Sequence, residues 1–402
     1  MVTNKEQNKL NVPHLRFPEF HGEWEKCKLG DIAILTKGSG ISKDQRSATG
    51  TPCILYGELY TTYKSEVIDY VVSKTDISDK NLVRSCANDI IIPSSGETAI
   101  DISTARCVLS PDVLLGGDLN IIRLKDGDGR FFSYQLNGVR KYDIAKIAQG
   151  VSVVHLYGES IKGLTVSFPS NKEQQKISTL LSLIDERIAT QSKLIEKLES
   201  LIKGINHRVF MNSGNNYKLG EICEIRSGYS GSQLLSKKGL KVSRIETISG
   251  HKVNMERVGY VAPFESSENY RLRVGDILFS NINSVEYIGN TAFIDKDYDL
   301  YHGMNLLRLT PNHMVVIPFY LYLLLNTNRM LNRFKAVCNK AVSQASINQT
   351  ELGKAVVQIP PIKTQEQICE LYQALYTKLE TESHTKSLFQ NQKQYMLRQM
   401  FI

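Results

Sequence analysis

Cysteine is scarce in this sequence, and its few copies are not arranged to bind zinc or to form a disulfide framework. Seven cysteines are scattered over 402 residues, and no two of them form a Cys-x-x-Cys pair. Structural zinc sites and disulfide scaffolds both need regularly paired cysteines. The pattern therefore predicts free, buried thiols in a reducing compartment.

Long apolar runs are also missing. The N-terminal MVTNKEQNKLN is polar and has no apolar segment of the kind that a signal peptide needs. The longest apolar stretch, 315–325, is too short to cross a bilayer and contains Pro318. We therefore expect a cytoplasmic protein with no membrane partner.

The motifs of several enzyme classes are absent as well. The sequence has no G-x-x-x-x-G-K-[ST] phosphate loop and no Asn-Pro-Pro or Asp-Pro-Pro followed by an aromatic residue. Its eight histidines show no His-x-His or His-Glu-x-x-His spacing, and we interpret His155 as a partly buried loop residue. Pro111-Asp112 is not followed by Asp/Glu-x-Lys before the next predicted helix. We therefore predict no catalytic residue, no metal ligand and no cofactor bound by this chain.

What the chain does contain is a repeat of about half its length. Three pairs of segments match: PSNKEQQKISTLLSLID (169–185) with PPIKTQEQICELYQALY (360–376), KLGDIAILTKG (28–38) with KLGEICEIRSG (218–228), and DLNIIRL (118–124) with GMNLLRL (303–309). The offsets between the members of these pairs are 191, 190 and 185. A period this long indicates duplicated domains rather than a solenoid. The drifting offset indicates that loops were inserted into a preserved framework, which is how binding specificity is commonly varied.

Each repeat is expected to have a globular part and a long helix. Short β-branched runs such as ANDIIIP, LTVSFP and GDILFS predict strands, and 131–148 and 318–337 predict helices. Asp31 and Glu221 follow Leu-Gly at matched positions, and we expect each to accept backbone hydrogen bonds rather than to share a metal. The predicted segments are a polar tail (1–11), a first globular domain (12–170), a central helix (171–213), a second globular domain (214–360) and a C-terminal helix (361–402).

The two long helices, 172–210 and 363–401, show alternating three- and four-residue spacings of apolar residues, which predict a coiled-coil seam. Gln191 interrupts the first seam, whereas Glu382, Lys386 and Lys393 weaken the second. The predicted seam residues are Leu181, Ile184, Ile188, Ile195, Leu198, Ile202, Tyr372, Leu375, Leu379 and Phe389. Because the first helix enters the second globular domain and the second helix leaves it, paired seams must run antiparallel. The alternative is that each helix folds onto its own globular domain.

The sequence thus predicts an α+β protein. Two mixed α/β domains are joined by two long antiparallel coiled-coil helices, and a pseudo-twofold axis relates the repeats. The formal net charge of +8 and the pI of about 8.9 are compatible with a polyanionic partner but do not require one.

At this point the residues resemble a known family. The run VPHLRFPEFHGEWEKCKLGDI (12–32), the two helix starts after Pro169 and Pro360, and the helix ends 208–210 and 398–401 are similar to the specificity subunits of type I restriction–modification enzymes. The second helix start departs from the family's Glu-Gln pair, because it has Thr364-Gln365, and this weakens any inference about a partner contact there.

The resemblance implies a division of labour. Each globular domain would be a target recognition domain that reads one half of a bipartite sequence in double-stranded DNA. The helices would hold the two halves apart and dock two modification (methyltransferase) subunits, which two restriction/motor subunits could join. S-adenosylmethionine, ATP and Mg²⁺ would belong to those partners, and this chain would not be an enzyme.

Four regions of the first repeat have the polar and basic side chains that contact DNA phosphates and base edges. They are the loop 36–47, the tyrosine-rich stretch 54–65, the turn 94–101 and the loop 146–155. Their candidate residues are Lys37, Ser39, Lys43, Arg46, Tyr60, Thr61, Lys64, Ser94, Ser95, Gln149 and Ser152. The structural alternatives are a solvated hairpin at 36–47 and a strand at 54–65 whose tyrosines belong to the core.

The second repeat has counterparts at 226–238, 280–287 and 338–347. Its candidate DNA-binding residues are Arg226, Ser227, Tyr229, Lys237, Arg244, Asn281, Asn283, Lys340, Ser343 and Gln344. Gln344 is a candidate for reading adenine, since an amide can bond to both N6 and N7 of that base. Two other functions stay open: a helical scaffold whose repeated domains bind protein, and a self-contained nuclease or methyltransferase with degenerate motifs. The repeat together with its basic loops favours DNA recognition.

Overall fold

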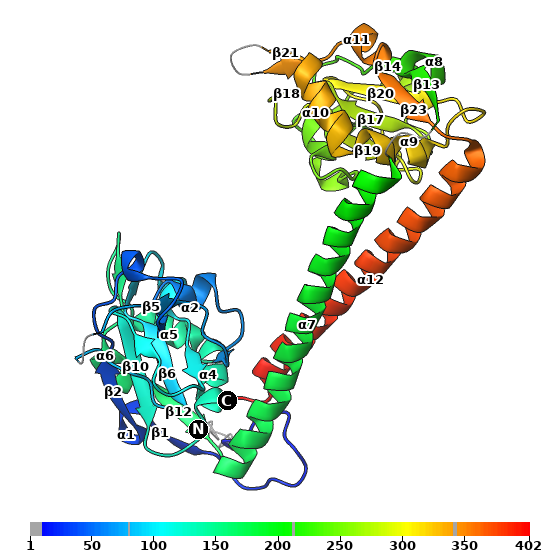
Figure 1. The fold of residues 1–402 in the computed structure, drawn as a ribbon. Helices are drawn as coiled ribbons and strands as arrows, with labels where there is room; N and C mark the ends of the chain where they lie inside the picture. The colour runs from blue at the N-terminus through cyan, green and yellow to red at the C-terminus, as the bar shows by residue number, and fades with distance from the viewer. Residues whose placement is uncertain (1–9, 79–80, 211–213, 341–343) are drawn as a thin grey trace, which may run out of the picture. The chain divides into compact units, whose positions relative to one another are not determined.

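The computed structural model describes residues 10–78, 81–210, 214–340 and 344–402 (Figure 1). The chain divides into two compact units. Unit 1 contains Met1–Lys193 and Glu382–Ile402, and unit 2 contains Leu194–Thr381. Each unit therefore includes one end of each long helix. The sequence analysis instead divided the chain into five segments, with each helix as a segment of its own, and that division stays a prediction.

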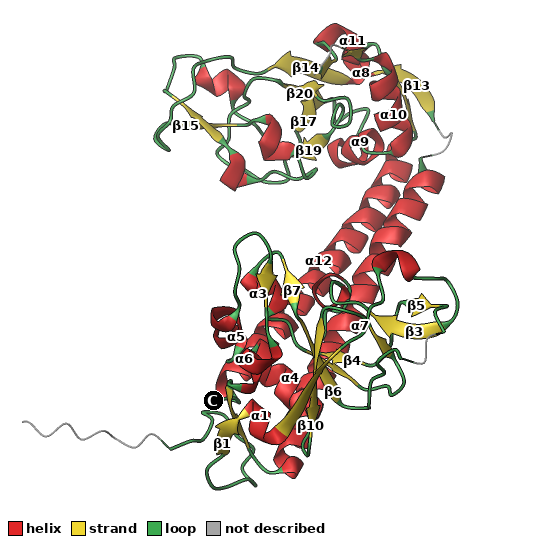
Figure 2. Cartoon of the chain, turned by 90° about the vertical axis from the view of Figure 1, so that its left-hand side faces the viewer, coloured by secondary structure: helices red, strands yellow, loops and turns green. Residues whose placement is uncertain are grey.

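The centre of unit 1 is a five-stranded sheet in the order β2-β10-β6-β8-β4. Its strands are β2 (Ala33–Lys37), β10 (Leu119–Leu124), β6 (Asp89–Pro93), β8 (Arg106–Val108) and β4 (Val67–Ile68). The β-branched residues of β6 are buried throughout. Helix α4 (Gly129–Asn137) lies beside β6 (Figure 2) and also contacts β8, and two apolar clusters contain alternate residues of β6, so both faces of this strand are covered.

Smaller elements surround this sheet. Strand β1 (Glu25–Lys28) pairs with β12 (Thr165–Phe168), β7 (Ser95–Gly96) pairs with β11 (Val154–His155), and β3 (Thr51–Ile54) lies between β5 (Lys74–Thr75) and β9 (Leu114–Leu115). The short helices of unit 1 are α1 (Leu29–Ile32), η1 (Lys43–Gln45), α2 (Glu58–Thr61), α3 (Ala99–Ile102), α5 (Lys141–Ile147) and α6 (Gly158–Lys162).

Unit 2 repeats the same plan around a four-stranded sheet. Its order is β14 (Cys223–Ser227), β20 (Leu306–Pro311), β17 (Ile277–Ser280) and β19 (Thr291–Phe293). The paired outer strands are β13 (Asn215–Lys218) with β23 (Val356–Ile359), β15 (Leu240–Val242) with β16 (Gly259–Val261), and β22 (Ala345–Ser346) between β18 (Ile282–Asn283) and β21 (Asn339–Lys340). Its short helices are α8 (Leu219–Ile222), η2 (Ile245–Ile248), η3 (Met255–Arg257), η4 (Ser267–Tyr270), α9 (Pro318–Leu325), α10 (Asn328–Val337) and α11 (Gln349–Gly353).

The matched carboxylates have the predicted role. The backbone N–H of Lys28 donates to Asp31 Oδ2 (3.1 Å), and the backbone N–H of Lys218 donates to Glu221 Oε2 (2.8 Å). Each carboxylate therefore caps the single-turn helix in which it lies, α1 or α8. This prediction is confirmed.

The offset of 185 predicted for the strand around 118–124 is wrong by two residues. In unit 1, Ile121 lies opposite Thr36 and Ile91; in unit 2, Arg308 lies opposite Arg226 and Leu278. The framework therefore aligns β10 with β20 at an offset of 187. A shift of two residues leaves every side chain on the same face of a strand, so the alternation of apolar residues could not reveal the error.

Both long helices form, and α12 is slightly shorter than predicted. Helix α7 (Asn171–Val209) has 39 residues and α12 (Ile362–Gln399) has 38, so α12 ends two residues before the predicted limit at 401. Of the ten predicted seam residues, none is exposed. Leu181, Ile184, Ile202 and Tyr372 are buried, and the other six are half-buried.

Within unit 1 the ends of α7 and α12 contact each other in reversed order. Asp185 bonds to Lys393 (2.5 Å), and the Arg187 guanidinium lies 5.8 Å from the centre of the Phe389 ring. The Gln191 amide donates to the backbone carbonyl of Glu382 (3.1 Å) and to its carboxylate. Gln191, which interrupts the first seam, thus forms hydrogen bonds with Glu382, which weakens the second seam. In unit 2, at the other helix ends, the Tyr372 hydroxyl donates to the Asn206 amide oxygen.

Lys393 is the centre of a buried charged cluster in unit 1. Its ammonium group pairs with Glu66 and Asp185 and lies 5.6 Å from the centre of the Tyr134 ring, whose hydroxyl donates to Asp185 (2.8 Å). The side chain of Lys393 is only 9% exposed. At the equivalent offset of 191, unit 2 has Ile202 and Tyr376 in place of Lys393 and Asp185, and both pack in its apolar core.

Candidate nucleic-acid interface

The structure brings together candidate regions that are far apart in the sequence. In both units this pairing involves the strand that follows the equivalent central strand, β6 in unit 1 and β17 in unit 2. In unit 1, β7 of the turn 94–101 pairs with β11 of the loop 146–155. In unit 2, β18 of the turn 280–287 pairs with β22 of the loop 338–347, which also pairs with β21. A small polar sheet beside the central sheet is therefore a shared feature of both units.

The predicted residues of unit 1 differ in exposure. Lys37, Lys43, Arg46, Thr61, Lys64, Gln149 and Ser152 are exposed, Ser39, Tyr60 and Ser94 are half-buried, and Ser95 is buried. The Ser39 hydroxyl accepts the backbone N–H of Val83 (2.7 Å), so this side chain holds a loop in place. Ser95 lies inside the β7·β11 pairing, where its side chain is only 9% exposed.

A cavity of about 770 Å³ joins the first two candidate regions of unit 1. Lys43, Arg46 and Thr61 all line it, although 15 residues separate Arg46 from Thr61. Arg46 lies 3.6 Å from the carboxylate of Glu58, which is buried and accepts the backbone N–H of Leu55 (2.9 Å). The cavity therefore has cations at its rim and a structural carboxylate in its wall.

The tyrosine-rich stretch 54–65 is not the strand that the sequence suggested. It continues from the end of β3 into the helix α2, because Glu58 caps the turn after Leu55. Tyr63 belongs to the core, where burial raises the pKa of its hydroxyl to about 12 and the hydroxyl accepts the backbone N–H of Val72 (3.2 Å). The other two tyrosines, Tyr56 and Tyr60, are half-buried, and Tyr56 lines the cavity.

The loop after α5 exposes His155 in addition to the predicted Gln149 and Ser152. Gln149 and His155 exchange backbone hydrogen bonds (2.9 and 2.7 Å), which hold Ser152 at the exposed tip between them. The interpretation of His155 as partly buried is wrong. Its side chain is exposed, since alternation along β11 turns Val154 inward and His155 outward, and its ring stacks on Tyr157 at 6.3 Å.

In unit 2, Arg226, Ser227, Lys237, Arg244 and Gln344 are exposed, and Tyr229, Asn281 and Asn283 are half-buried. Tyr229 stacks on Phe264 at 3.9 Å, so most of this ring serves packing. Asn281 donates to the backbone carbonyl of Ile347 (3.3 Å), which joins the two candidate loops. Lys340 lies in β21, and Ser343 lies outside the described residues.

Two residues that the sequence reading missed lie beside Arg226 and Ser227. Arg308 and His302 line the same polar cavity of about 340 Å³, although they are 8% and 1% exposed. An arginine within the buried strand LLRLT was the available signal, since charged residues are almost never buried without a partner. The alignment at offset 185 hid it, because it matched Arg308 to Arg123, which is ion-paired with Asp89.

Burial of His302 makes the stability of unit 2 depend on pH. Burial lowers the pKa of this imidazole to about 4, so between about pH 6.5 and 4 the unfolded chain binds a proton that the folded unit does not. Stability should therefore fall as the pH falls through this window, by up to about 3 kcal/mol from this group. We expect His302→Leu to remove that part of the acid destabilisation, measured as the difference between calorimetric transitions at pH 7 and pH 4.5. An unchanged pH dependence would contradict the assignment.

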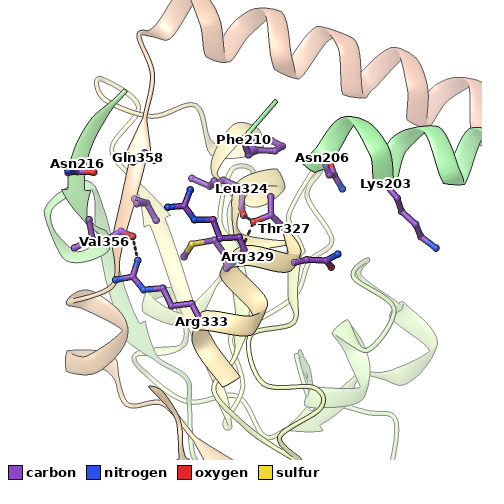
Figure 3. A pocket seen from close by; sticks show the side chains of 13 residues that line it. Lys203, Asn206, Phe210, Asn216, Leu324, Thr327, Arg329, Arg333, Val356 and Gln358 are labelled. Atoms are coloured by element: carbon purple, nitrogen blue, oxygen red, sulfur yellow. Dashed lines mark hydrogen bonds between the residues drawn. The ribbon is translucent and has the colours of Figure 1, made fainter. Parts of the chain in front are cut away.

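A further cavity of unit 2, about 530 Å³ in volume, lies at the end of α7 (Figure 3). It is lined by Lys203 of α7, by Phe210 just after that helix, and by Arg329 and Arg333 of α10, and Arg333 donates to the backbone carbonyl of Val356 (2.6 Å). None of its described lining residues is a predicted DNA-binding residue. It is therefore separate from the candidate interface.

Potential metal ligands and thiols form no cluster among the residues that the structure describes. Residues 10–78, 81–210, 214–340 and 344–402 contain no group of three or more His, Cys, Asp or Glu side chains that could hold a metal ion. The cysteines there are unpaired, and burial raises the pKa of Cys53 to about 11 and of Cys223 to about 12, which keeps these thiols protonated and unreactive. No helix in the same ranges combines the length and apolarity needed to span a membrane.

Comparison with known proteins agrees with this arrangement. The family model described as "Type I restriction modification DNA specificity domain" matches twice, at residues 21–200 and 213–388. The putative type I restriction enzyme MjaX specificity subunit of Methanocaldococcus jannaschii is 38% identical over 188 residues, which are 46% of this chain and 44% of that protein. The chain thus spans less than half of that relative. The MjaVIII specificity subunit of the same organism is 22% identical over 429 residues, covering 98% of this chain and 95% of the relative.

Solved structures show the same fold. The crystal structure of a type I restriction–modification S subunit from M. genitalium superposes with a TM-score of 0.62 at 18% identity, covering 97% of this chain and 99% of that one. Two tandem matches to a DNA specificity domain, one over each repeat, define the class of protein to which the chain belongs. The chain belongs to the family of type I restriction–modification specificity subunits, and it carries two target recognition domains.

Proposed function

We propose that this chain is the non-catalytic, sequence-reading subunit of a type I restriction–modification complex, in which each unit reads one half of a bipartite DNA target. The observation that carries the proposal is the shared polar sheet, β7·β11 in unit 1 and β18·β22·β21 in unit 2. Its framework position is the same in both units, but its side chains differ. Such a design keeps the placement of the reading surface constant while the bases read can change.

The two long helices are proposed to form an antiparallel coiled coil that sets the distance between the half-sites. The reversed order of the contacts in unit 1 supports this geometry. Gln191 and Glu382 differ by 191, the offset of the helix repeat, and they contact each other. In a twofold-related pair, a residue contacts its own counterpart only at the axis. We therefore place the pseudo-twofold axis at this hydrogen bond.

The catalytic steps are assigned to partner subunits. Two modification subunits would dock on the helices and hold S-adenosylmethionine, and two restriction/motor subunits would supply ATP hydrolysis and Mg²⁺-dependent cleavage. What supports this assignment is that candidate DNA-contacting loops pair in each unit and that α7 and α12 contact each other in the reversed order that a spacer needs. A protein-binding scaffold and a self-contained enzyme, the two alternatives, lack a specific observation in their favour.

Exchange of one unit tests the proposal. The change replaces residues 12–170 with the matching segment of another family member, in the complex with its modification subunits. We expect half of the methylated sequence to change and the other half and the spacer to stay constant, because unit 2 and the helices are untouched. Sequencing of methylated sites in the genome of the expressing cell measures the outcome.

Two controls complete this experiment. The isolated chain, incubated with S-adenosylmethionine and DNA, is expected to transfer no methyl group. The parental complex fixes the reference sequence. A chimera that altered both half-sites would show that the units do not read independently, and methyl transfer by the isolated chain would refute the non-catalytic role.

A further inference from the structure

The cavity beside β14 in unit 2 is lined by polar side chains at positions where unit 1 has apolar ones. It has a volume of about 340 Å³ and is lined by Arg226 and Ser227 of β14, Ser266, Asn269, Tyr270 and Gln349, with His302 and Arg308 as its buried members. Every one of these side chains can donate a hydrogen bond in at least one protonation or tautomeric state, and none is a carboxylate. A cavity of this composition favours a ligand rich in acceptors.

The same framework positions in unit 1 are apolar. At the offset of 187, Arg308 corresponds to Ile121 and His302 to Leu115. The glycine contacts agree with this offset: a Cβ on Gly38 would lie 2.0 Å from the carbonyl oxygen of Gly116, and a Cβ on Gly228 would lie 1.9 Å from that of Gly303. Ile121 and Leu115 are fully buried in an apolar cluster. The fold therefore does not need polar groups at these positions.

Arg308 is a buried cation whose hydrogen-bonding capacity is only partly used. Its Nη1 donates to the backbone carbonyl of Arg271 (3.2 Å), whereas its Nε has no partner. Of the carboxylates in the described ranges, none forms an ion pair with it, and Arg271 itself pairs with Asp297. Arg226, directly opposite on β14, adds a like charge to the same face and is only locally balanced by Glu224. Two neighbouring arginines are costly unless an anion lies between them.

His302 lines the cavity together with Arg308 and carries no charge of its own. Its Nε2 lies 2.9 Å from the backbone carbonyl of Leu306, which fixes that nitrogen as the donor and leaves Nδ1 unprotonated and without a partner. The ring is 1% exposed and lines the same cavity as Arg308. A neutral imidazole at this place keeps the cavity from accumulating a third positive charge when no ligand is bound.

We propose that this cavity is an anion site of unit 2 that receives one phosphate group of the DNA backbone, with Arg308 at its floor and Arg226 and Ser227 at its rim. The proposal rests on the proposed function, since it assigns a contact within the DNA-reading unit. A phosphate fits better than a base edge, because phosphates project from the duplex and can enter a concave site, whereas base edges lie recessed in the grooves. Arginine also matches phosphate oxygens in a bidentate manner.

The first test uses the full chain without DNA. Inorganic phosphate is titrated against the wild-type chain and the variants Arg308→Ile and Arg308→Lys, with thermal unfolding as the readout. Isoleucine is the residue of unit 1 at this position, so it should be tolerated by the fold. We expect millimolar phosphate to stabilise the wild type, Arg308→Lys to retain part of the effect and Arg308→Ile to lose it. Equal stabilisation of all three would overturn the site.

The second test uses the assembled complex and duplexes with and without the methylated target. We expect Arg308→Ile to weaken binding to both duplexes by a similar factor of about 5 to 100 and to lower the slope of log K against log salt by about one. The methylated sequence should stay the same. Arg257→Ile, which removes one positive charge from unit 2 outside this cavity, is the matched control and should leave the slope closer to that of the wild type.

The outcomes separate the inference from the proposed function. If Arg308→Ile changes which base is methylated, Arg308 reads a base and the phosphate assignment is wrong. If affinity and slope do not change, the cavity does not contact DNA, although the chain would still be a specificity subunit. If the wild-type complex methylates no bipartite sequence, the proposed function itself fails, whatever the phosphate titration shows.

Discussion

Replacement of Lys393 by alanine is expected to lower the free energy of unfolding of unit 1 by about 3–5 kcal/mol. Lys393 pairs with Glu66 and Asp185 in a site from which water is largely excluded. A second buried cation, Arg106, is 7% exposed and is attracted electrostatically by the same two carboxylates. Loss of one cation leaves two carboxylates facing a single guanidinium, so a negative charge remains buried without a partner.

The only tryptophan makes this effect measurable for unit 1 alone. Trp24 is buried against Phe131 and Phe401 in unit 1, so its fluorescence reports the unfolding of that unit by denaturant. Lys146→Ala removes an exposed partner of Asp143 and should cost less than about 1 kcal/mol. The double variant Lys393→Met/Asp185→Asn restores the balance of one carboxylate and one guanidinium and should recover most of the loss. Equal losses for Lys393→Ala and Lys146→Ala would contradict the role of the cluster.

This cluster marks a limit of reading the sequence. The spacing of apolar residues predicted both long helices and their seam, because helical periodicity is a local pattern. The same pattern identified Lys393 only as a weak point of the seam. Its partners Glu66 and Asp185 lie 327 and 208 residues away along the chain, and no local rule connects them. Pairing across such distances follows from the tertiary fold alone.

For the candidate interface, the sequence likewise predicted the regions but not all of the individual residues. Matching turns after matching strands predicted the regions that the structure joins in β7·β11 and β18·β22. Individual residues were less predictable, since exposure depends on packing from other elements: Ser95 is enclosed by a strand pairing, and Tyr229 by Phe264. Arg308 was missed because a slip of two residues preserves the alternation of a strand. The equivalence of Arg308 and Ile121 follows from the registers of the paired strands, not from sequence similarity.

Lengthening both helices at equivalent positions is expected to lengthen the spacer of the DNA target and leave the half-sites unchanged. The change inserts four residues after Ser192 and four after Ser383, positions that differ by 191 and flank the contact between Gln191 and Glu382. Four residues add about 6 Å and about 40° of rotation to a helix. One or two base pairs add about 3.4–6.8 Å and about 34–69° to B-DNA. The inserted length and twist therefore match a spacer longer by one or two base pairs.

Insertion in both helices matters because their contacts run in opposite directions. Four residues added to α7 alone would shift Asp185 and Arg187 relative to Lys393 and Phe389, unless the contacts on the other side of the insertion were lost instead. We therefore expect the single insertion to abolish or strongly reduce methylation, whereas the double insertion methylates a target with the original half-sites and a longer spacer. Sequencing of methylated sites distinguishes these results. An active double variant with an unchanged spacer would show that the helices do not set the distance, because the reading edges of both units are untouched by the insertion.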